Sequence, residues 1–217
     1  PRSRRQQLPP WNFSWPAQTE VTVPNHPTRD GALFIVFEGG EGAGKSTQVT
    51  LLAERLRLAG YRPVRTREPG GTPVAEAIRA LVLAPASPMS DRCEALLFAA
   101  ARADHTQQFI APHLQAGDVV ISDRYVDSSR AYQGAARGLA AAEIAELSVW
   151  ATDNRVPHLT IVLDVDPRHG LARAQDHNRM ESEDLGFHDT VRRAFLTFAQ
   201  QDVDRYLVLD AAQPVAV

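Results

Sequence analysis

Residues 39–46 form a glycine-rich loop whose residue types suit phosphate binding. Their sequence, GGEGAGKS, fits the pattern G-x-x-x-x-G-K-[ST], in which backbone N–H groups surround phosphate oxygens at the start of a helix. Gly39, Gly42 and Gly44 allow backbone angles that turn successive N–H groups inward, and they carry no Cβ that would obstruct a phosphate. The pattern therefore predicts a binding loop for a nucleoside triphosphate.

Two side chains at the end of the loop are predicted to complete this site. Lys45 is expected to reach the terminal phosphates, and the Ser46 hydroxyl is expected to coordinate Mg²⁺, which prefers hard oxygen ligands. An accidental match is disfavoured because the flanking residues also fit. Residues 34–37 are an apolar strand candidate, and apolar residues recur at helical spacing from Val49 to Leu56.

Glu41 places a carboxylate inside a loop that should bind an anion. A carboxylate that faced inward would repel the triphosphate, so we expect Glu41 to project outward, toward a neutral hydroxyl or a cation. The alternative is a solvated loop charge. The loop by itself leaves both interpretations open.

The elements that must position this loop alternate between strands and helices. Strands are predicted at 33–38, 63–66, 119–122, 159–165 and 206–209, and helices at 45–59, 74–82, 91–115, 127–136, 140–152, from 167 onward and up to 201. Strands that are apolar on both faces predict a parallel sheet covered on both sides. We therefore expect an α/β fold with a doubly wound, five-stranded parallel sheet, and ligands at the carboxyl ends of its strands.

Length and composition favour one domain preceded by an extension. The chain has 217 residues, of which 44% are hydrophobic, which is enough for one well-buried domain and short for two. Residues 1–30 are rich in proline and arginine and lack hydrophobic periodicity. We expect them to be a poorly ordered extension, with a partner-binding arm as the alternative, and the domain to span 31–217.

Composition also limits the kinds of partner and the cellular compartment that we expect for this chain. A net charge of −3 gives no broad basic surface for nucleic acid, and no apolar run approaches the roughly 18 residues of a membrane span. The single cysteine, Cys93, cannot form an intrachain disulfide, which fits a reducing compartment, and its apolar neighbours suggest a buried side chain. We therefore expect a cytoplasmic protein without nucleic-acid or membrane partners.

Four segments together carry a resemblance to a known family. They are 34–48, which contains the loop, 67–72 (REPGGT), 94–102 (EALLFAAAR) and 123–134 (DRYVDSSRAYQG). These segments closely resemble the bacterial thymidylate kinases, and the likeness extends from Gly31 to Pro214. It implies an enzyme that transfers the γ-phosphoryl group of ATP to dTMP in dTTP synthesis, that uses Mg²⁺ and that forms a homodimer.

The resemblance implies residues for the acceptor nucleotide. Glu41 would accept a hydrogen bond from the 3′-hydroxyl of dTMP, which agrees with its expected outward direction. Phe98 would stack on thymine, and Arg102, one turn later on the same helix face, would reach thymine O4. Core packing of Phe98 is the alternative, but it would leave the neighbouring arginine without an explained partner. The other implied contacts are Arg67, Pro69, Ser128, Ser129, Gln133 and Tyr132, the last of which would disfavour a ribose 2′-hydroxyl.

The resemblance also implies which residues contact the donor nucleotide, ATP, and how the phosphoryl group is transferred. The contacts implied for ATP are Gly39, Gly40, Glu41, Gly42, Ala43, Gly44, Lys45, Ser46, Thr47 and Gln213. Arg124 would hold the acceptor phosphate, and Asp123 would act on Mg²⁺ through water. Because a phosphate monoester has a second pKa of about 6, the attacking oxygen is already anionic at pH 7 and needs no general base. Positioning and charge neutralisation then suffice for transfer.

The segment at the position of the family's lid departs from the pattern. Related enzymes with an acidic residue in the phosphate loop carry arginines in a mobile lid, whereas residues 174–184 look short and poor in arginine. Arg173 and Arg179 are the candidates for this catalytic role, and a solvated charged face is the alternative. A closed lid would exclude water and so prevent hydrolysis of ATP.

Other functions are weighed against this hypothesis. One is a kinase for another nucleoside monophosphate or for a deoxynucleoside. Another is a hydrolase or switch, although the sequence has no N-K-x-D guanine signature. Because the lid segment is short and poor in arginine, a third possible function is an inactive nucleotide-binding module. Asp164 and Asp166 are interpreted as strand-end and helix-cap carboxylates, and no histidine has Cys or His partners at the spacing of a zinc site.

Overall fold

The computed structural model describes residues 31–85, 88–174 and 178–213, so the extension expected at 1–30 and part of the expected lid lie outside it. All strand pairs in these residues are parallel, and they form one sheet in the order β2-β3-β1-β4-β5. The strands are β1 (Leu33–Glu38), β2 (Pro63–Arg67), β3 (Val119–Asp123), β4 (Leu159–Asp164) and β5 (Tyr206–Asp210). The predicted α/β fold with a five-stranded parallel sheet is confirmed.

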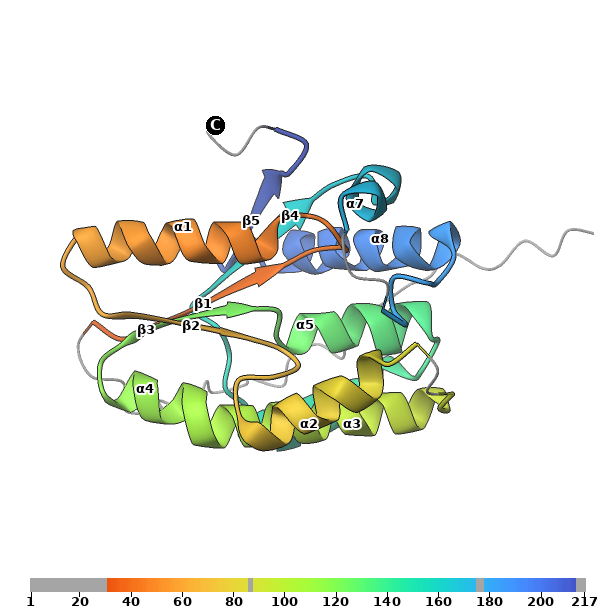
Figure 1. Ribbon diagram of the computed structural model, residues 1–217, viewed down its shortest axis with the longest axis horizontal. Coiled ribbons are helices and arrows are strands. Elements are labelled where there is room, and N and C mark those ends of the chain that lie inside the picture. The colour runs from red at the N-terminus through yellow and green to blue at the C-terminus, as the bar shows by residue number, and fades with distance from the viewer. Residues whose placement is uncertain (1–30, 86–87, 175–177, 214–217) are drawn as a thin grey trace, which may run out of the picture.

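Helices cover both faces of this sheet. They are α1 (Lys45–Leu58), α2 (Pro73–Leu83), α3 (Asp91–His105), α4 (Ala111–Gln115), α5 (Val126–Ser129), α6 (Ala141–Thr152), α7 (Pro167–Arg173) and α8 (Leu185–Gln201), with π-helical η1 (Thr106–Ile110) and η2 (Arg130–Ala136). Figure 1 shows α1 on one side of the sheet and α2, α3 and α4 on the other. The helices predicted at 91–115 and 127–136 thus each contain a π-helical stretch, which hydrophobic periodicity did not predict.

The two faces of the strands build separate parts of the core. Ile35 and Phe37 of β1 belong to the cluster under α1, whereas Phe34 and Val36 pack with residues of η1 and α4 such as Ile110. A third cluster joins β4, η2 and α8. Because successive strand residues point to opposite faces and both faces are covered, the central strands β1, β3 and β4 form nearly continuous apolar runs.

Side-chain caps fix the starts of several helices around the sheet. Thr72, Ser90 and Asp184 each accept a hydrogen bond from a backbone N–H in the first turn of α2, α3 and α8, a contribution of about 1 kcal/mol per cap. Asp166 caps α7 in the same way, and Asp164 at the end of β4 forms an ion pair with Arg192. The predicted structural roles of these two carboxylates are confirmed.

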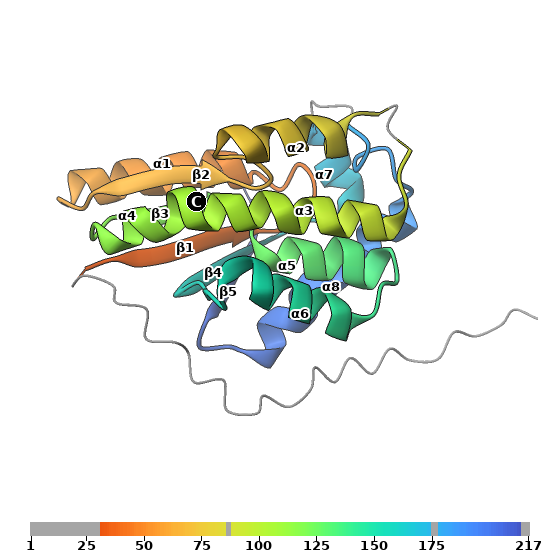
Figure 2. The ribbon, with the colours of Figure 1, turned by 90° about the horizontal axis from the view of Figure 1, so that it is seen from below.

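The prediction that Cys93 is buried is wrong. Figure 2 shows α3 running beside α6, and buried residues of α3 such as Ala95, Ala99 and Arg102 lie on one face of the helix. Cys93, Leu96 and Ala100 follow at i, i+3 and i+7, so they share the opposite, exposed face. Among the described residues no helix is both long and apolar enough to span a membrane.

Candidate active site

The loop between β1 and α1 is held in shape by close backbone packing. Gly42 has φ 64°, and a Cβ at this position would lie 1.8 Å from the carbonyl oxygen of Gly170 in α7. The buried Lys45 ammonium turns back over the loop and donates to Gly39 O at 3.2 Å and Gly40 O at 2.7 Å. Burial and the nearby Arg124 lower the pKa of Lys45. The predicted strand, loop and helix are therefore present, with a cation at the N-terminus of α1.

The sheet brings Asp123 to the first turn of α1. Because β3 lies beside β1, the carboxylate at the end of β3 reaches the Ser46 hydroxyl, which donates to Asp123 Oδ2 at 2.6 Å. Two hard oxygen ligands thus meet beside the phosphate loop. This donor set fits Mg²⁺.

Arg124 lies between the phosphate loop and the neighbouring pocket. Its guanidinium donates to Gly39 O at 3.0 Å and to Ser128 Oγ at 3.2 Å, and it forms an ion pair with Glu41 at 2.8 Å. The backbone of Arg124 has φ 73°, an uncommon value outside glycine. Its N–H and C=O are fixed by hydrogen bonds to Phe37 O and from Ser122 Oγ. Burial favours the neutral guanidine, but Glu41 and Asp123 raise the pKa of Arg124 above its usual value.

Glu41 faces a cation and a hydroxyl, as predicted. One of its oxygens accepts hydrogen bonds from Arg124 Nη2 and from Tyr132 OH, each at 2.8 Å, and only 17% of the side chain is exposed. Burial alone would raise the pKa of Glu41, but Arg124 and Lys45 lower it to about 2. The alternative of a solvated loop charge is therefore excluded, and Glu41 is an anion at neutral pH.

Glu38 holds the backbone of the residues that follow Arg124 in place. This fully buried carboxylate accepts hydrogen bonds from the backbone N–H groups of Tyr125 and Ser128, at 2.9 and 3.1 Å, and from Ser128 Oγ at 2.7 Å. Burial and the charge of Asp127 raise the pKa of Glu38 to about 8. The sequence analysis used Glu38 only as the end of a strand. Its place directly before the phosphate loop was the available signal for a supporting role.

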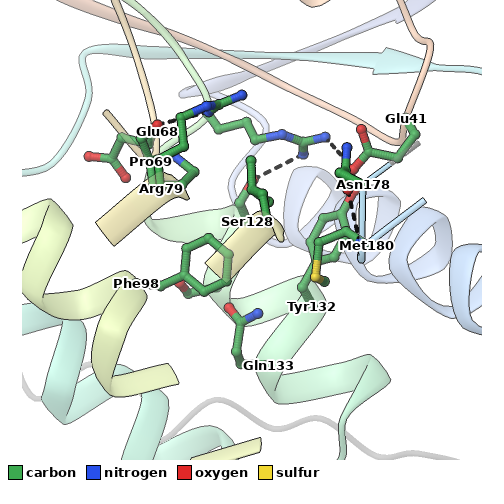
Figure 3. Close-up of a pocket in the computed structure, with 13 residues that line it drawn as sticks. Glu41, Glu68, Pro69, Arg79, Phe98, Ser128, Tyr132, Gln133, Asn178 and Met180 are labelled. Carbon is green, nitrogen blue, oxygen red and sulfur yellow. Dashed lines mark hydrogen bonds and ion pairs between the residues drawn. The ribbon is translucent and has the colours of Figure 1, made fainter. Parts of the chain in front are cut away.

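A pocket opens next to Arg124, with about 490 Å³ of space when the open solvent at its mouth is included. Figure 3 shows Phe98 and Gln133 on one side of it, with Ser128, Tyr132 and Glu41 toward the phosphate loop. The residues that line it are Glu41, Glu68, Pro69, Arg79, Leu83, Phe98, Arg124, Ser128, Ser129, Tyr132, Gln133, Asn178 and Met180. Eight of the ten residues predicted for the acceptor side lie in this lining, and the two exceptions are Arg67 and Arg102. The pocket can therefore hold a planar ring at Phe98 and an anion near Arg124.

Arg79 is a pocket residue that the sequence analysis missed. It comes from α2 and donates from Nη1 to Pro69 O at 2.8 Å. Burial and the nearby charge of Arg67 lower its pKa. The only signal in the sequence was an arginine within the apolar helix that follows the REPGGT segment. A second cation thus faces the same pocket as Arg124.

Arg102 lies behind the pocket wall. Only 3% of its side chain is exposed, and it donates to Glu68 at 2.6 Å, to Ser129 Oγ at 2.9 Å and to Tyr125 O at 3.0 Å. The argument that core packing of Phe98 would leave Arg102 without an explained partner is wrong, because Glu68 supplies the counter-charge. Arg67, for its part, is exposed and donates to both carboxylate oxygens of Glu76.

The arginines considered for the lid make contacts away from the pocket. Arg173 donates to Ala211 O at 3.0 Å, and Arg179 forms an ion pair with Glu94 at 2.7 Å. Asn178 and Met180, which flank Arg179, line the pocket instead. The remaining predicted ATP contacts are both exposed. Thr47 lies in the first turn of α1, and Gln213 donates to Asp210 after β5.

Comparisons with known proteins agree on one family. A sequence model of the thymidylate kinase family matches residues 37–217. Thymidylate kinase of Pseudomonas fluorescens (strain SBW25) is 52% identical over 188 residues, which cover 85% of this chain and 90% of the relative. That of Leifsonia xyli subsp. xyli is 48% identical over 194 residues, which cover 87% and 91%. The crystal structure of thymidylate kinase from Ehrlichia chaffeensis superimposes with a TM-score of 0.71 at 35% identity, over 82% of this chain and 93% of that one.

Proposed function

This chain belongs to the thymidylate kinase family and transfers the γ-phosphoryl group of ATP to dTMP, and we propose that Lys45 and Arg124 hold the two reacting nucleotides. The observation that carries this assignment is the position of Arg124. Its guanidinium contacts a carbonyl of the phosphate loop and also lines the pocket that contains Phe98. A phosphate bound in that pocket would meet Arg124 at the edge of the loop.

The donor nucleotide binds along the phosphate loop. Backbone N–H groups from Gly39 to Thr47 surround its phosphates at the start of α1, and Lys45 leaves its two carbonyl partners to neutralise them. Gln213, after β5, lies on the adenine side. Ser46 and Asp123 would hold Mg²⁺, which neutralises phosphate charge when bound.

The acceptor dTMP occupies the pocket. Thymine stacks on Phe98, and the phosphate lies between Arg79 and Arg124. Glu41, which is anionic and turned away from the loop, accepts a hydrogen bond from the 3′-hydroxyl, and Tyr132 beside it disfavours a 2′-hydroxyl.

Three arginines among the remaining proposed contacts must exchange hydrogen bonds when nucleotides bind. Arg102 gives up Ser129 to reach thymine O4, and Arg67, beside Pro69, gives up Glu76 to close the nucleoside side. Ser128 and Ser129 need no such movement, because both already line the pocket. Of the two lid arginines, Arg173 gives up Ala211 O to reach the transferring phosphoryl group, whereas Arg179 keeps its ion pair with Glu94.

Chemistry at this site needs no general base. The dTMP phosphate is already anionic at pH 7, so Arg124 and Lys45 bring two like-charged groups into line and stabilise the charge on the transferred group. The low pKa of Glu41 keeps a carboxylate paired with Arg124, which holds the guanidinium at the edge of the loop.

The protein is further proposed to be a cytoplasmic homodimer, with the kinase domain at 31–217 following the extension at 1–30. Exposed apolar side chains on the neighbouring helices α3 and α6 support self-association, since Leu96 is 59% and Trp150 is 82% exposed. Light scattering tests this proposal. A monomeric mass at assay concentrations would contradict it.

A coupled ADP-release assay with dTMP, dUMP, dCMP and AMP as acceptors tests the substrate. We expect dTMP to give the highest kcat/KM, whereas a preference for another acceptor would establish the alternative kinase. If ATP is hydrolysed as fast without any acceptor as with one, the result would support the hydrolase hypothesis. A Mg²⁺ titration of the wild type against Ser46→Ala tests the metal site, and we expect the variant to need about tenfold more Mg²⁺.

A further inference from the structure

Glu94 is a buried carboxylate that none of the roles above uses. It lies on α3, one turn before Phe98, and only 1% of its side chain is exposed. Its oxygens accept hydrogen bonds from Gln133 Nε2 at 2.7 Å and from Arg137 Nη2 at 3.2 Å, and Arg179 forms an ion pair with it at 2.7 Å. Two guanidinium groups therefore hold Glu94 as an anion directly behind the pocket.

The charge on Glu94 determines which way the amide of Gln133 faces. An ionised carboxylate can only accept hydrogen bonds, so it requires the NH₂ group of Gln133 and rejects the carbonyl. Gln133 also lines the pocket, and Figure 3 shows its amide below the ring of Phe98. With one N–H given to Glu94, the carbonyl oxygen Oε1 and the second N–H remain for a ligand stacked on Phe98.

This fixed orientation matches one type of pyrimidine edge. Thymine presents an N3–H donor beside the O4 acceptor, whereas cytosine presents an N3 acceptor beside an N4 amino donor. Oε1 accepts from thymine N3–H while Nε2 donates to O4. Cytosine requires the same amide turned by 180°, which would set its carbonyl against Glu94.

We propose that Glu94 is a positioning residue that makes the acceptor site select thymine over cytosine by locking the amide of Gln133. This inference rests on the proposed function, in which dTMP stacks on Phe98. Uracil has the same N3–H and O4 as thymine. The fixed orientation of the Gln133 amide therefore discriminates against dCMP and has no effect on the choice between dTMP and dUMP.

The test variant is Glu94→Gln. Arg137 and Arg179 still require an acceptor, so the new amide turns its oxygen to them and its NH₂ to Gln133. Gln133 must then present its carbonyl to residue 94 and its NH₂ to the pocket. The expected result is a fall of at least about tenfold in the ratio of kcat/KM for dTMP over dCMP, with the ratio for dTMP over dUMP unchanged.

Glu183→Gln is the matched control. Glu183 forms an ion pair with Arg137 at 2.6 Å, so this variant makes the same chemical change in the same network but leaves the bond from Gln133 to Glu94 intact. It should keep both ratios at the wild-type values. If Glu94→Gln does not fold, as judged by thermal unfolding, Glu94→Asp keeps the charge and withdraws the acceptor from Gln133, and it should lower the same dTMP to dCMP ratio.

Two results overturn the inference. One is a dTMP to dCMP ratio that stays within twofold of the wild-type value in the folded variant, and the other is an equal fall in both ratios, which indicates general damage. Failure of the proposed function is distinguishable from either, because the wild type itself would then show no preference for dTMP.

Discussion

Replacement of Arg124 by alanine should abolish most of the turnover and leave ATP binding nearly unchanged. In the structure the guanidinium contacts the loop only through Gly39 O and Glu41, and it lines the acceptor pocket. The ATP phosphates are assigned to the backbone N–H groups and to Lys45, which the variant keeps. Alanine is also no worse than arginine at φ 73°, because both carry a Cβ.

The magnitude follows from the bonds that the guanidinium can give to a phosphate. A hydrogen bond to a charged group contributes about 1.5–3 kcal/mol, and a bidentate pair offers two. Loss of about 4 kcal/mol from the transition state corresponds to a fall in kcat of about 10³ at 25 °C. The KM for ATP should change by less than about threefold, because no assigned ATP contact is removed.

The variant should also lose less stability on acidification than the wild type does. Arg124 holds the pKa of Glu41 at about 2, below the 4.5 of an unperturbed glutamate. A lowered folded-state pKa contributes stability above pH 4.5 that is lost as the pH falls toward 2. Without Arg124 the pKa of Glu41 rises, so the unfolding free energy of the variant should depend less on pH in this range and be lower than that of the wild type at pH 5.

The measurement is ADP release at saturating dTMP, together with direct titration of an unreactive ATP analogue. Arg124→Lys is the control, since it keeps the charge but not the planar fork, and its kcat should lie between those of the wild type and Arg124→Ala. If kcat and ATP affinity fall by the same factor, Arg124 acts on the donor, and the assignment of the acceptor phosphate is refuted.

Two further predictions concern residues that hold the site in shape, Gly42 and Glu38. Gly42→Ala should lower the unfolding free energy by about 2 kcal/mol or more and weaken ATP binding, because its Cβ would lie 1.8 Å from Gly170 O, whereas Gly40→Ala, with no atom within 4 Å, should not change thermal unfolding. The raised pKa of Glu38, about 8, means that the folded state binds a proton more tightly than the unfolded state, so wild-type stability should fall as the pH rises from 4.5 to 8. Glu38→Gln should remove that fall in denaturant titrations across this range, and an unchanged slope would show that Glu38 titrates normally.

Local patterns were enough to predict most of the framework. The phosphate loop and Lys45 are encoded within eight consecutive residues, because a tight turn depends on nearby backbone angles. Most strand positions followed from apolar runs, and the role of Arg124 followed from the resemblance of its segment to the thymidylate kinases. The outward direction of Glu41 followed from charge repulsion with a bound phosphate.

Contacts between distant segments were not predictable in this way. The exposure of Cys93 depended on which face of α3 the other helices cover. The partner of Arg102 is Glu68, 34 positions away, and Gln133 meets Glu94 across 39 positions. Periodicity indicates which residues are buried, but it does not say which buried charges meet.

By itself, the sequence determined the order of strands and helices, the phosphate loop and the residues available for the site, because these depend on neighbours along the chain. Only the tertiary structure decided how those residues pair. Crossovers bring β3 beside β1, and this sets Asp123 against Ser46 and Arg124 against Glu41. The packing of α3 against η2 then places Glu94 behind Gln133, since a buried carboxylate is stable only where distant parts of the chain supply its donors.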